Sequence, residues 1–167
     1  MSSTAVGVYT NVHSYTFVTD KMLTSIKNIV RMSGLDPAKM TSEWPTLELG
    51  IRTWLSDGDL EEVHLEVFSR TTNKLVGRWD FEIFYGRSGD GSFSQDPDAI
   101  KYHLRSLGLN PANCDYRIVT STASGRRTVQ GWSSTSLRST DGLVKQGIGT
   151  TIGAGSIATG TSYWRKK

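Results

Sequence analysis

The chain has 167 residues, a formal net charge of +3 and 37% apolar residues, an ordinary composition for a globular domain. No stretch approaches the roughly 20 consecutive apolar residues of a membrane-spanning helix, and the N-terminus lacks the basic and apolar regions of a secretory signal. Cys114 is the only cysteine, which excludes a disulfide within the chain. We therefore expect one domain over 1–167, located in the reducing cytoplasm.

The positive charge is concentrated at the C-terminal end. Residues 121–167 contain seven basic residues and one acidic residue, a formal charge of +6, so the remainder carries −3. This asymmetry favours nucleic acid or an acidic protein surface as a partner. A solvated basic end that only promotes solubility explains the same charges, and the sequence leaves both interpretations open.

The first elements expected in the chain are a strand and a helix. β-Branched and aromatic residues are frequent in 6–17, which favours a strand. Thr19 or Asp20 is expected to cap the following helix, and Gly34 to end it. One face of that helix is apolar and carries Met22, Ile26, Ile29 and Val30.

A second helix is predicted between residues 41 and 58. Thr41 or Ser42 can cap it, Pro45 is acceptable in its first turn, and Gly58 stops it. Its apolar stripe consists of Leu47, Ile51, Trp54 and Leu55.

Two alternating runs follow and predict an antiparallel hairpin. Residues 63–68 and 79–85 alternate between apolar and polar side chains, and the polar turn 70–74 separates them. In the first run His64 and Glu66 occupy the polar positions, so this strand is expected to have one buried and one solvated face.

A third helix and a further strand complete the first three quarters of the chain. Asp96 is the expected cap and Pro97 the first helical residue, and residues 116–122 read as a strand. The buried face of this helix is expected to be Ile100, Leu104 and Leu107, with Gly108 after it. The order strand–helix–helix–strand–strand–helix–strand predicts an α+β fold with an antiparallel sheet.

The last segment, 123–167, is rich in Ser, Thr and Gly, yet large apolar residues recur throughout it. Glycine is a poor strand former, so any strands here are expected to be marginal. A strand with one thinly apolar face can pair in more than one register. The composition thus predicts a segment that folds against the rest of the chain without a strong preference for one arrangement.

Catalytic motifs are missing from the sequence. The His64-Leu65-Glu66 triplet resembles the H-x-E of zinc deaminases, but the P-C-x-x-C that must accompany it is absent. The three histidines are scattered and only one cysteine is present, so we expect no metal site. No phosphate-binding loop or hydrolase elbow occurs either. The protein is therefore expected not to be an enzyme and to use no cofactor.

An alternative function is binding of single-stranded nucleic acid. Tyr163 and Trp164 are followed by residues 165–167, all basic, and this combination of stacking surface and positive charge is typical of single-strand binders. A structural protein whose last strand ends in a basic tip is the other interpretation of the same residues.

Several blocks of the sequence resemble the bacterial HORMA-domain proteins of CBASS antiphage signalling operons. The resemblance extends over nearly the whole chain and rests on the order of elements and on these blocks, because this family has no catalytic motif. The blocks are SYTFVTDKMLTSIKNIVRMSGLDPAKM (14–40), GIRTWL (50–55), LVGRWDFEI (75–83), GWSSTSLRSTDG (131–142) and SYWRK (162–166).

This resemblance implies an antiparallel sheet backed by three helices and a C-terminal safety belt that repacks around a short closure-motif peptide. The body would be 15–122, the belt 123–167, and 1–14 a mobile segment or strand. The peptide would add as a strand to the edge formed by 116–122. The residues expected to contact it are Tyr116, Ile118, Thr120, Trp132 and Leu137.

The resemblance also implies where the end of the belt docks. Its last strands, 143–164, would lie beside 75–85, and the strand 6–17 would compete for the same edge, which makes a two-state element. The residues expected to dock the belt are Val144, Ile148, Ile152, Tyr163 and Trp164.

The partners implied by the resemblance are proteins and a peptide. The closed, peptide-bound form would bind and activate a cyclic-oligonucleotide synthase (a CD-NTase) in antiviral defence. An AAA+ ATPase of the HORMA-remodeller type would grip the N-terminus, with Val6, Val8 and Tyr9 in its handle, and reopen the belt. A second HORMA protein is a further expected partner, and no membrane is expected to take part.

Overall fold

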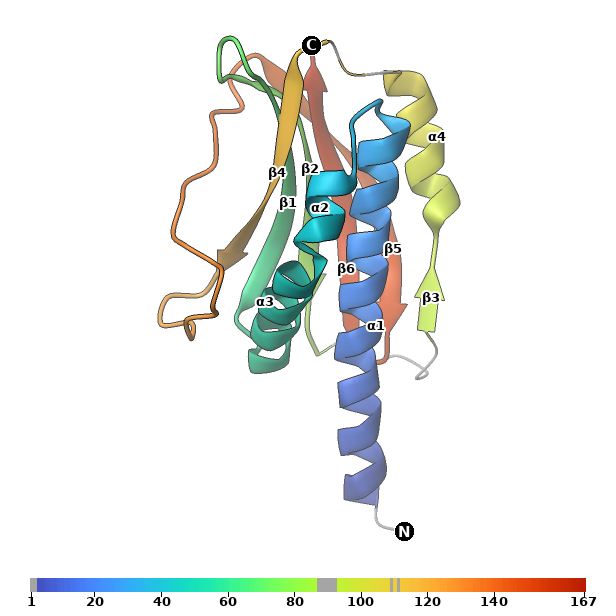
Figure 1. Cartoon of the computed structure of the whole chain (residues 1–167). Coiled ribbons are helices and arrows are strands. Elements are labelled where there is room, and N and C mark those ends of the chain that lie inside the picture. The colour runs from blue at the N-terminus through green and yellow to red at the C-terminus, as the bar shows by residue number, and fades with distance from the viewer. Residues whose placement is uncertain (1–2, 87–92, 109, 111) are drawn as a thin grey trace.

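The described part of the chain begins with a long helix and contains three further helices; Figure 1 shows their arrangement around the sheet. The computed structural model describes residues 3–86, 93–108, 110 and 112–167, and within 3–12 it describes the backbone. The helices are α1 (Ser3–Met32), α2 (Ala38–Ser42), α3 (Trp44–Asp57) and α4 (Pro97–Leu107). None of the described helices combines the length and hydropathy needed to cross a bilayer.

The strand predicted over 6–17 is wrong, because these residues belong to α1. Thr19 does not cap a helix; it lies buried within α1, where its hydroxyl donates to the carbonyl of Tyr15 at 2.7 Å. From Ser14 to Ile29 the buried positions recur every three or four residues and face the sheet. The packing of that stripe outweighs the small helix penalty of β-branched residues. Gly34, with φ of 86°, ends the helix as expected.

Among the described residues, six strands form one sheet in the order β3-β5-β6-β2-β1-β4, and every neighbouring pair is antiparallel. This arrangement confirms the predicted α+β fold and the hairpin of β1 with β2. Figure 1 shows the helices on one face of the sheet, with β4 at one outer edge. The strands are β1 (Leu60–Ser69), β2 (Leu75–Phe84), β3 (Phe93–Gln95), β4 (Cys114–Thr122), β5 (Leu143–Ala154) and β6 (Ile157–Lys166).

The core lies between the helices and the inner face of the sheet. Trp54 of α3 and Phe81 of β2 are among its largest fully buried side chains. The cap predicted for α3 at Thr41 or Ser42 is wrong, since α2 occupies those residues and Glu43 precedes α3 without a side-chain cap. Gly58 does end α3 in the left-handed conformation.

Helix α4 begins as its sequence predicts and differs at its far end. The Asp96 carboxylate accepts from the amide of Ala99 at 3.2 Å, and Pro97 is the first helical residue. Leu107, expected in the buried face, is 38% exposed, because the helix ends there and is no longer covered by the sheet.

The outer face of β1 is buried rather than solvated, which contradicts the alternation read from the sequence. His64 is 1% exposed and Glu66 is fully buried. His64 Nδ1 lies 2.6 Å from Asp80 Oδ1, and Arg78 Nε donates to the same oxygen at 2.8 Å. Burial alone would raise the pKa of Asp80, but the bonds from His64 and Arg78 outweigh it and hold the pKa below its ordinary value. Paired polar groups therefore replace solvent on this face.

Candidate functional site: a cavity between an edge strand and the crossing segment

The free edge of β4 offers unpaired backbone groups. Tyr116 directs its amide and carbonyl away from β1, because the amide donates to its neighbour Asp115 at 2.7 Å and the carbonyl accepts from Lys39 Nζ at 3.2 Å. Backbone direction alternates along an antiparallel strand. Ile118 and Thr120 consequently also direct their amides and carbonyls outward, and in the described chain no backbone group of another segment bonds to them there.

A segment without regular structure, 123–142, runs outside β4 before the chain returns to the sheet as β5 (Figure 1). We call it the crossing segment, and we use belt for the whole of 123–167. It is not hydrogen-bonded to β4 as a strand would be. Its conformation therefore depends on side-chain contacts at its two ends.

The first end of the crossing segment is fixed on α3. Arg127 forms a two-pronged ion pair with Asp57, and its carbonyl accepts from Trp54 Nε1 at 2.8 Å. Five residues later, Trp132 Nε1 donates to the carbonyl of Thr46 at 2.9 Å. The rings of Trp54 and Trp132 meet edge to face with centroids 5.1 Å apart, a favoured geometry for aromatic pairs.

Glycine at position 50 of α3 makes this contact possible. A Cβ at Gly50 would overlap the indole of Trp132, so only glycine lets the ring lie against the helix backbone. Glycine inside a helix costs about 1 kcal/mol relative to alanine. The close approach of Trp132 is the physical reason for the residue at this position.

The second end of the crossing segment is fixed by the carboxylate of Glu66. Arg138 donates to it twice, through its amide at 2.7 Å and its guanidinium at 2.8 Å. Arg117 of β4 donates to it at 2.5 Å and also bonds to the carbonyl of Ser136 at 2.6 Å. Burial by itself would raise the pKa of Glu66, but the Arg138 amide and the two guanidinium groups outweigh it, so its pKa is lowered.

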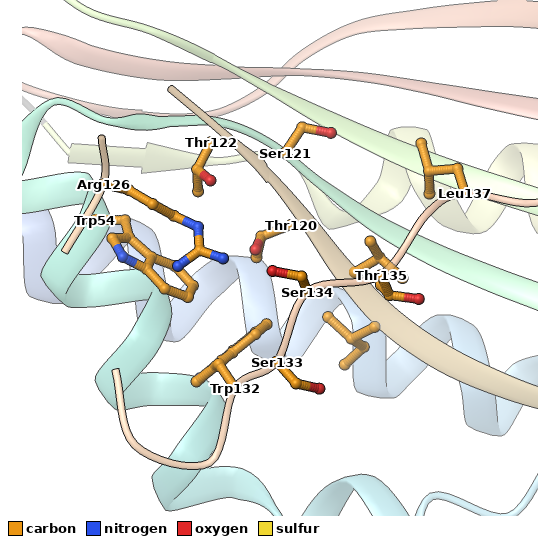
Figure 2. Close-up of a pocket in the computed structure, with 12 residues that line it drawn as sticks. Trp54, Thr120, Ser121, Thr122, Arg126, Trp132, Ser133, Ser134, Thr135 and Leu137 are labelled. Carbon is orange, nitrogen blue, oxygen red and sulfur yellow. The ribbon is translucent and has the colours of Figure 1, made fainter. Parts of the chain in front are cut away.

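Between these two attachments lies a cavity of about 410 Å³, with β4 on one side and the crossing segment on the other (Figure 2). Its lining is mostly hydroxyl and apolar groups, with Arg126 as the one charged residue. The guanidinium of Arg126 lies 5.0 Å from the ring centre of Trp54. The lining residues are Trp54, Ile118, Val119, Thr120, Ser121, Thr122, Arg126, Trp132, Ser133, Ser134, Thr135 and Leu137.

Four of the five residues expected to contact a peptide line this cavity, namely Ile118, Thr120, Trp132 and Leu137. Tyr116 does not line it. Its ring lies on the same face of the sheet as Ile118 and Thr120 but is buried against α2, where the hydroxyl donates to the carbonyl of Asp36 at 2.8 Å and accepts from the amide of Met40.

The residues expected to dock the belt lie on β5 and β6, and β6 pairs with β2 over 78–84. Ile152 and Tyr163 are in the core, where Tyr163 stacks on Trp79 with ring centres 4.8 Å apart. Trp164 lies on the outer face and donates through Nε1 to Asp80 at 3.0 Å. Ile148 is half-buried, whereas Val144 is 36% exposed. Tyr163 is thus buried and offers no stacking surface to single-stranded nucleic acid, whereas Trp164 is only half-buried.

The residues of the expected handle, Val6, Val8 and Tyr9, belong to the first turns of α1. Figure 1 shows this part of the helix projecting beyond the sheet and the other helices. The N-terminal segment of the described chain is therefore a helical extension rather than a strand competing for an edge.

Sequence reasoning missed the residues that hold the crossing segment in place. The carboxylate of Glu66 binds Arg117, 51 residues later in the sequence, and Arg138, 72 residues later. No local sequence pattern links these three residues. Trp54 was assigned to the core, which is correct, but its indole nitrogen also binds the belt. The concentration of basic residues after 121 and the family resemblance of 131–142 pointed to this region, but neither identified these contacts.

A family model described as bacterial HORMA domain 2 matches residues 3–167. The chain belongs to the bacterial HORMA domain family. A chain of the mitotic checkpoint complex aligns with a TM-score of 0.77 at 10% identity, over 92% of this HORMA chain and 99% of that one. No curated protein matches the sequence.

Two further solved structures share the fold of this HORMA chain. C. elegans HTP-2 bound to the HIM-3 closure motif aligns with a TM-score of 0.59 at 14% identity, over 89% of this chain and 90% of that one. The E. coli MS115-1 complex of CdnC with HORMA-deltaN aligns with a TM-score of 0.61 at 12% identity, over 93% and 89%. Identities this low show a common fold and carry no residue roles.

Proposed function

We propose that this HORMA protein is a non-enzymatic adaptor that holds a short peptide in the cavity between β4 and the crossing segment. The single observation that carries the proposal is the outward-facing backbone of Ile118 and Thr120. These two residues line the cavity, and the crossing segment forms its other side. A peptide that added there as a strand would satisfy these groups, and the crossing segment would enclose it. Main-chain bonds of this kind supply affinity, and side-chain pockets supply specificity.

The peptide-loaded protein would then bind and activate a cyclic-oligonucleotide synthase in antiviral defence inside the cell. Two facts support a partner of this kind: the family resemblance, and a HORMA chain of the same fold that was solved in complex with CdnC. An AAA+ ATPase would reopen the belt by engaging the projecting start of α1, which holds Val6, Val8 and Tyr9. A second HORMA protein is a further partner in the same proposal.

A proline at position 120 tests the binding mode. Proline removes an amide donor, and at Thr120 that donor faces the free edge rather than β1, so β4 should stay paired. Thr120→Pro should therefore lose peptides that a display library yields on the wild-type chain, whereas Thr120→Val should retain them. Thermal unfolding checks that both variants fold. A Thr120→Pro variant that is folded and still binds would exclude strand addition at this edge.

A second measurement does not depend on the variant folding. Selected peptides are resynthesised with single backbone N-methyl groups at each position. Methylation at alternate positions should abolish binding, because only every second residue directs its amide toward β4. Uniform tolerance of methylation would contradict the proposal. Synthase activation is measured separately, by comparing product formation with peptide-loaded and peptide-free protein.

A further inference from the structure

The cavity contains a positive charge that the fold itself leaves without a counter-ion. Among the described residues, Arg117, Arg127 and Arg138 are each paired with a carboxylate, whereas Arg126 forms no ion pair. Figure 2 shows the Arg126 side chain along Trp54, with its guanidinium directed toward Thr120. Its guanidinium carbon lies 5.0 Å from the ring centre of Trp54, a contact that uses none of the guanidinium N–H donors.

The other residues that line the cavity do not neutralise the charge of Arg126. None of the twelve lining residues is acidic, and six of them carry hydroxyl groups. A cavity with one sign of charge and low-dielectric walls concentrates its field on an oppositely charged ligand. The nearest paired arginine of the crossing segment, Arg127, is already neutralised by Asp57 outside the cavity.

Arg126 and Trp132 approach the edge of β4 from the same side of the sheet, because Arg126 lies over Trp54 of α3 and Trp132 packs on the same helix. Thr120 and Ile118, two residues apart, face that side too, since they pair with the buried Val63 and Leu65. Residues two apart on a strand lie about 7 Å from each other on one face. A strand added beside β4 would therefore place one side chain near Arg126 and another, two positions away, near Ile118 and Trp132.

We propose that the ligand of this cavity is an extended peptide that carries an Asp or Glu side chain for Arg126 and a large apolar side chain two residues away for Trp132 and Ile118. This inference rests on the proposed function, and it adds the chemistry of the recognised sequence. Arg126 is then the specificity-determining residue. Loss of the carboxylate should weaken binding about tenfold, the factor that corresponds to a hydrogen bond involving charged partners.

The test is a random heptapeptide display selection carried out in parallel on three full-length proteins: wild type, Arg126→Glu and Arg165→Glu. Arg165→Glu changes the net charge of the belt by the same amount as Arg126→Glu, but Arg165 is exposed at the end of β6. Wild type and Arg165→Glu should select an acidic residue two positions from an apolar one. Arg126→Glu should lose that acidic residue and select Lys or Arg in its place.

Synthetic peptides then quantify the effect. Replacing the selected Asp or Glu by Asn or Gln should raise the Kd about tenfold on wild type and hardly change it on Arg126→Gln, while C-terminal amidation should have no effect on either. If amidation of the C-terminus raised the Kd, the ligand of Arg126 would be the terminal carboxylate of the peptide, and its assignment to an Asp or Glu side chain would be overturned. Peptides selected on wild type without an acidic residue would overturn the inference and leave the proposed function standing. No selection on wild type or Arg165→Glu would overturn both.

Discussion

Replacing Glu66 by Gln is expected to release the crossing segment and to lower the stability of the whole chain. The carboxylate of Glu66 is fully buried and accepts three hydrogen bonds, from the Arg138 amide, the Arg138 guanidinium and Arg117. Glutamine keeps the shape but removes the charge, and its amide nitrogen cannot accept from any of these donors. Two guanidinium groups then lose their counter-ion.

The magnitude follows from the burial of the three side chains. Breaking a fully buried ion pair costs about 3–5 kcal/mol. The side chains of Arg117 and Arg138 are 29% and 18% exposed, so water recovers part of that loss. We expect Glu66→Gln to lower the free energy of unfolding by about 2.5 kcal/mol, which corresponds to a Tm lower by about 5–10 °C for a domain of this size.

Two assays separate the local from the global effect. Thermal unfolding gives the change in Tm, with Glu61→Gln on the same strand as the matched control, because Glu61 is exposed and should change the Tm by less than about 1 °C. Hydrogen exchange gives the local effect, since the Arg138 amide that bonds to Glu66 should exchange faster. A Glu66→Gln protein as stable as Glu61→Gln would refute the idea that this carboxylate holds the belt.

The pH dependence has a definite sign. The folded-state pKa of Glu66 lies below its ordinary value, so its contribution is fully present above about pH 4.3, the value in the unfolded chain. It is lost as the pH falls through the lower, folded-state pKa. The stability difference between wild type and Glu66→Gln should therefore narrow under acid conditions, and a difference that stays constant to pH 2 would contradict the assignment.

Three further predictions concern single positions. Gly50→Ala should lower the free energy of unfolding by about 1–3 kcal/mol despite the better helix propensity of alanine, because its Cβ displaces Trp132. Denaturant unfolding measures this change. Gly147→Ala is the control, because a Cβ at that position meets no other atom. Asp96→Ala should cost about 1 kcal/mol through loss of the α4 cap, measured the same way, and a neutral result would show that the cap is dispensable. Burial raises the pKa of the Cys114 thiol, so its alkylation at pH 8 should be slow in the folded protein and fast in denaturant; equal rates would show that the thiol is exposed.

The choice of point variants reflects the position of the belt in the sheet. β6 lies between β5 and β2, and Ile152, Ile157 and Tyr163 of the belt are buried in the core. Removing 143–167 would expose that core, so such a deletion would report unfolding rather than peptide release. Substitutions in the crossing segment and at Glu66 perturb the cavity and leave the sheet intact.

The sequence by itself determined the elements whose signals are local. Asp96 with Pro97 marked the start of α4, the alternation in 63–68 and 79–85 marked the hairpin, and Gly58 marked the end of α3. Each of these signals acts within a few residues, through capping, backbone conformation or side-chain periodicity. The blocks that resemble HORMA proteins added the family and the overall architecture.

Tertiary structure decided the features that depend on partners far away in the chain. Residues 6–17 look like a strand in isolation, but they continue a helix whose later turns pack on the sheet. Glu66 occupies a position that alternation assigns to solvent, and it is buried because Arg138, 72 residues later, crosses over it. Local propensity differs by only about 1 kcal/mol between such alternatives, and long-range packing and ion pairing are strong enough to reverse it.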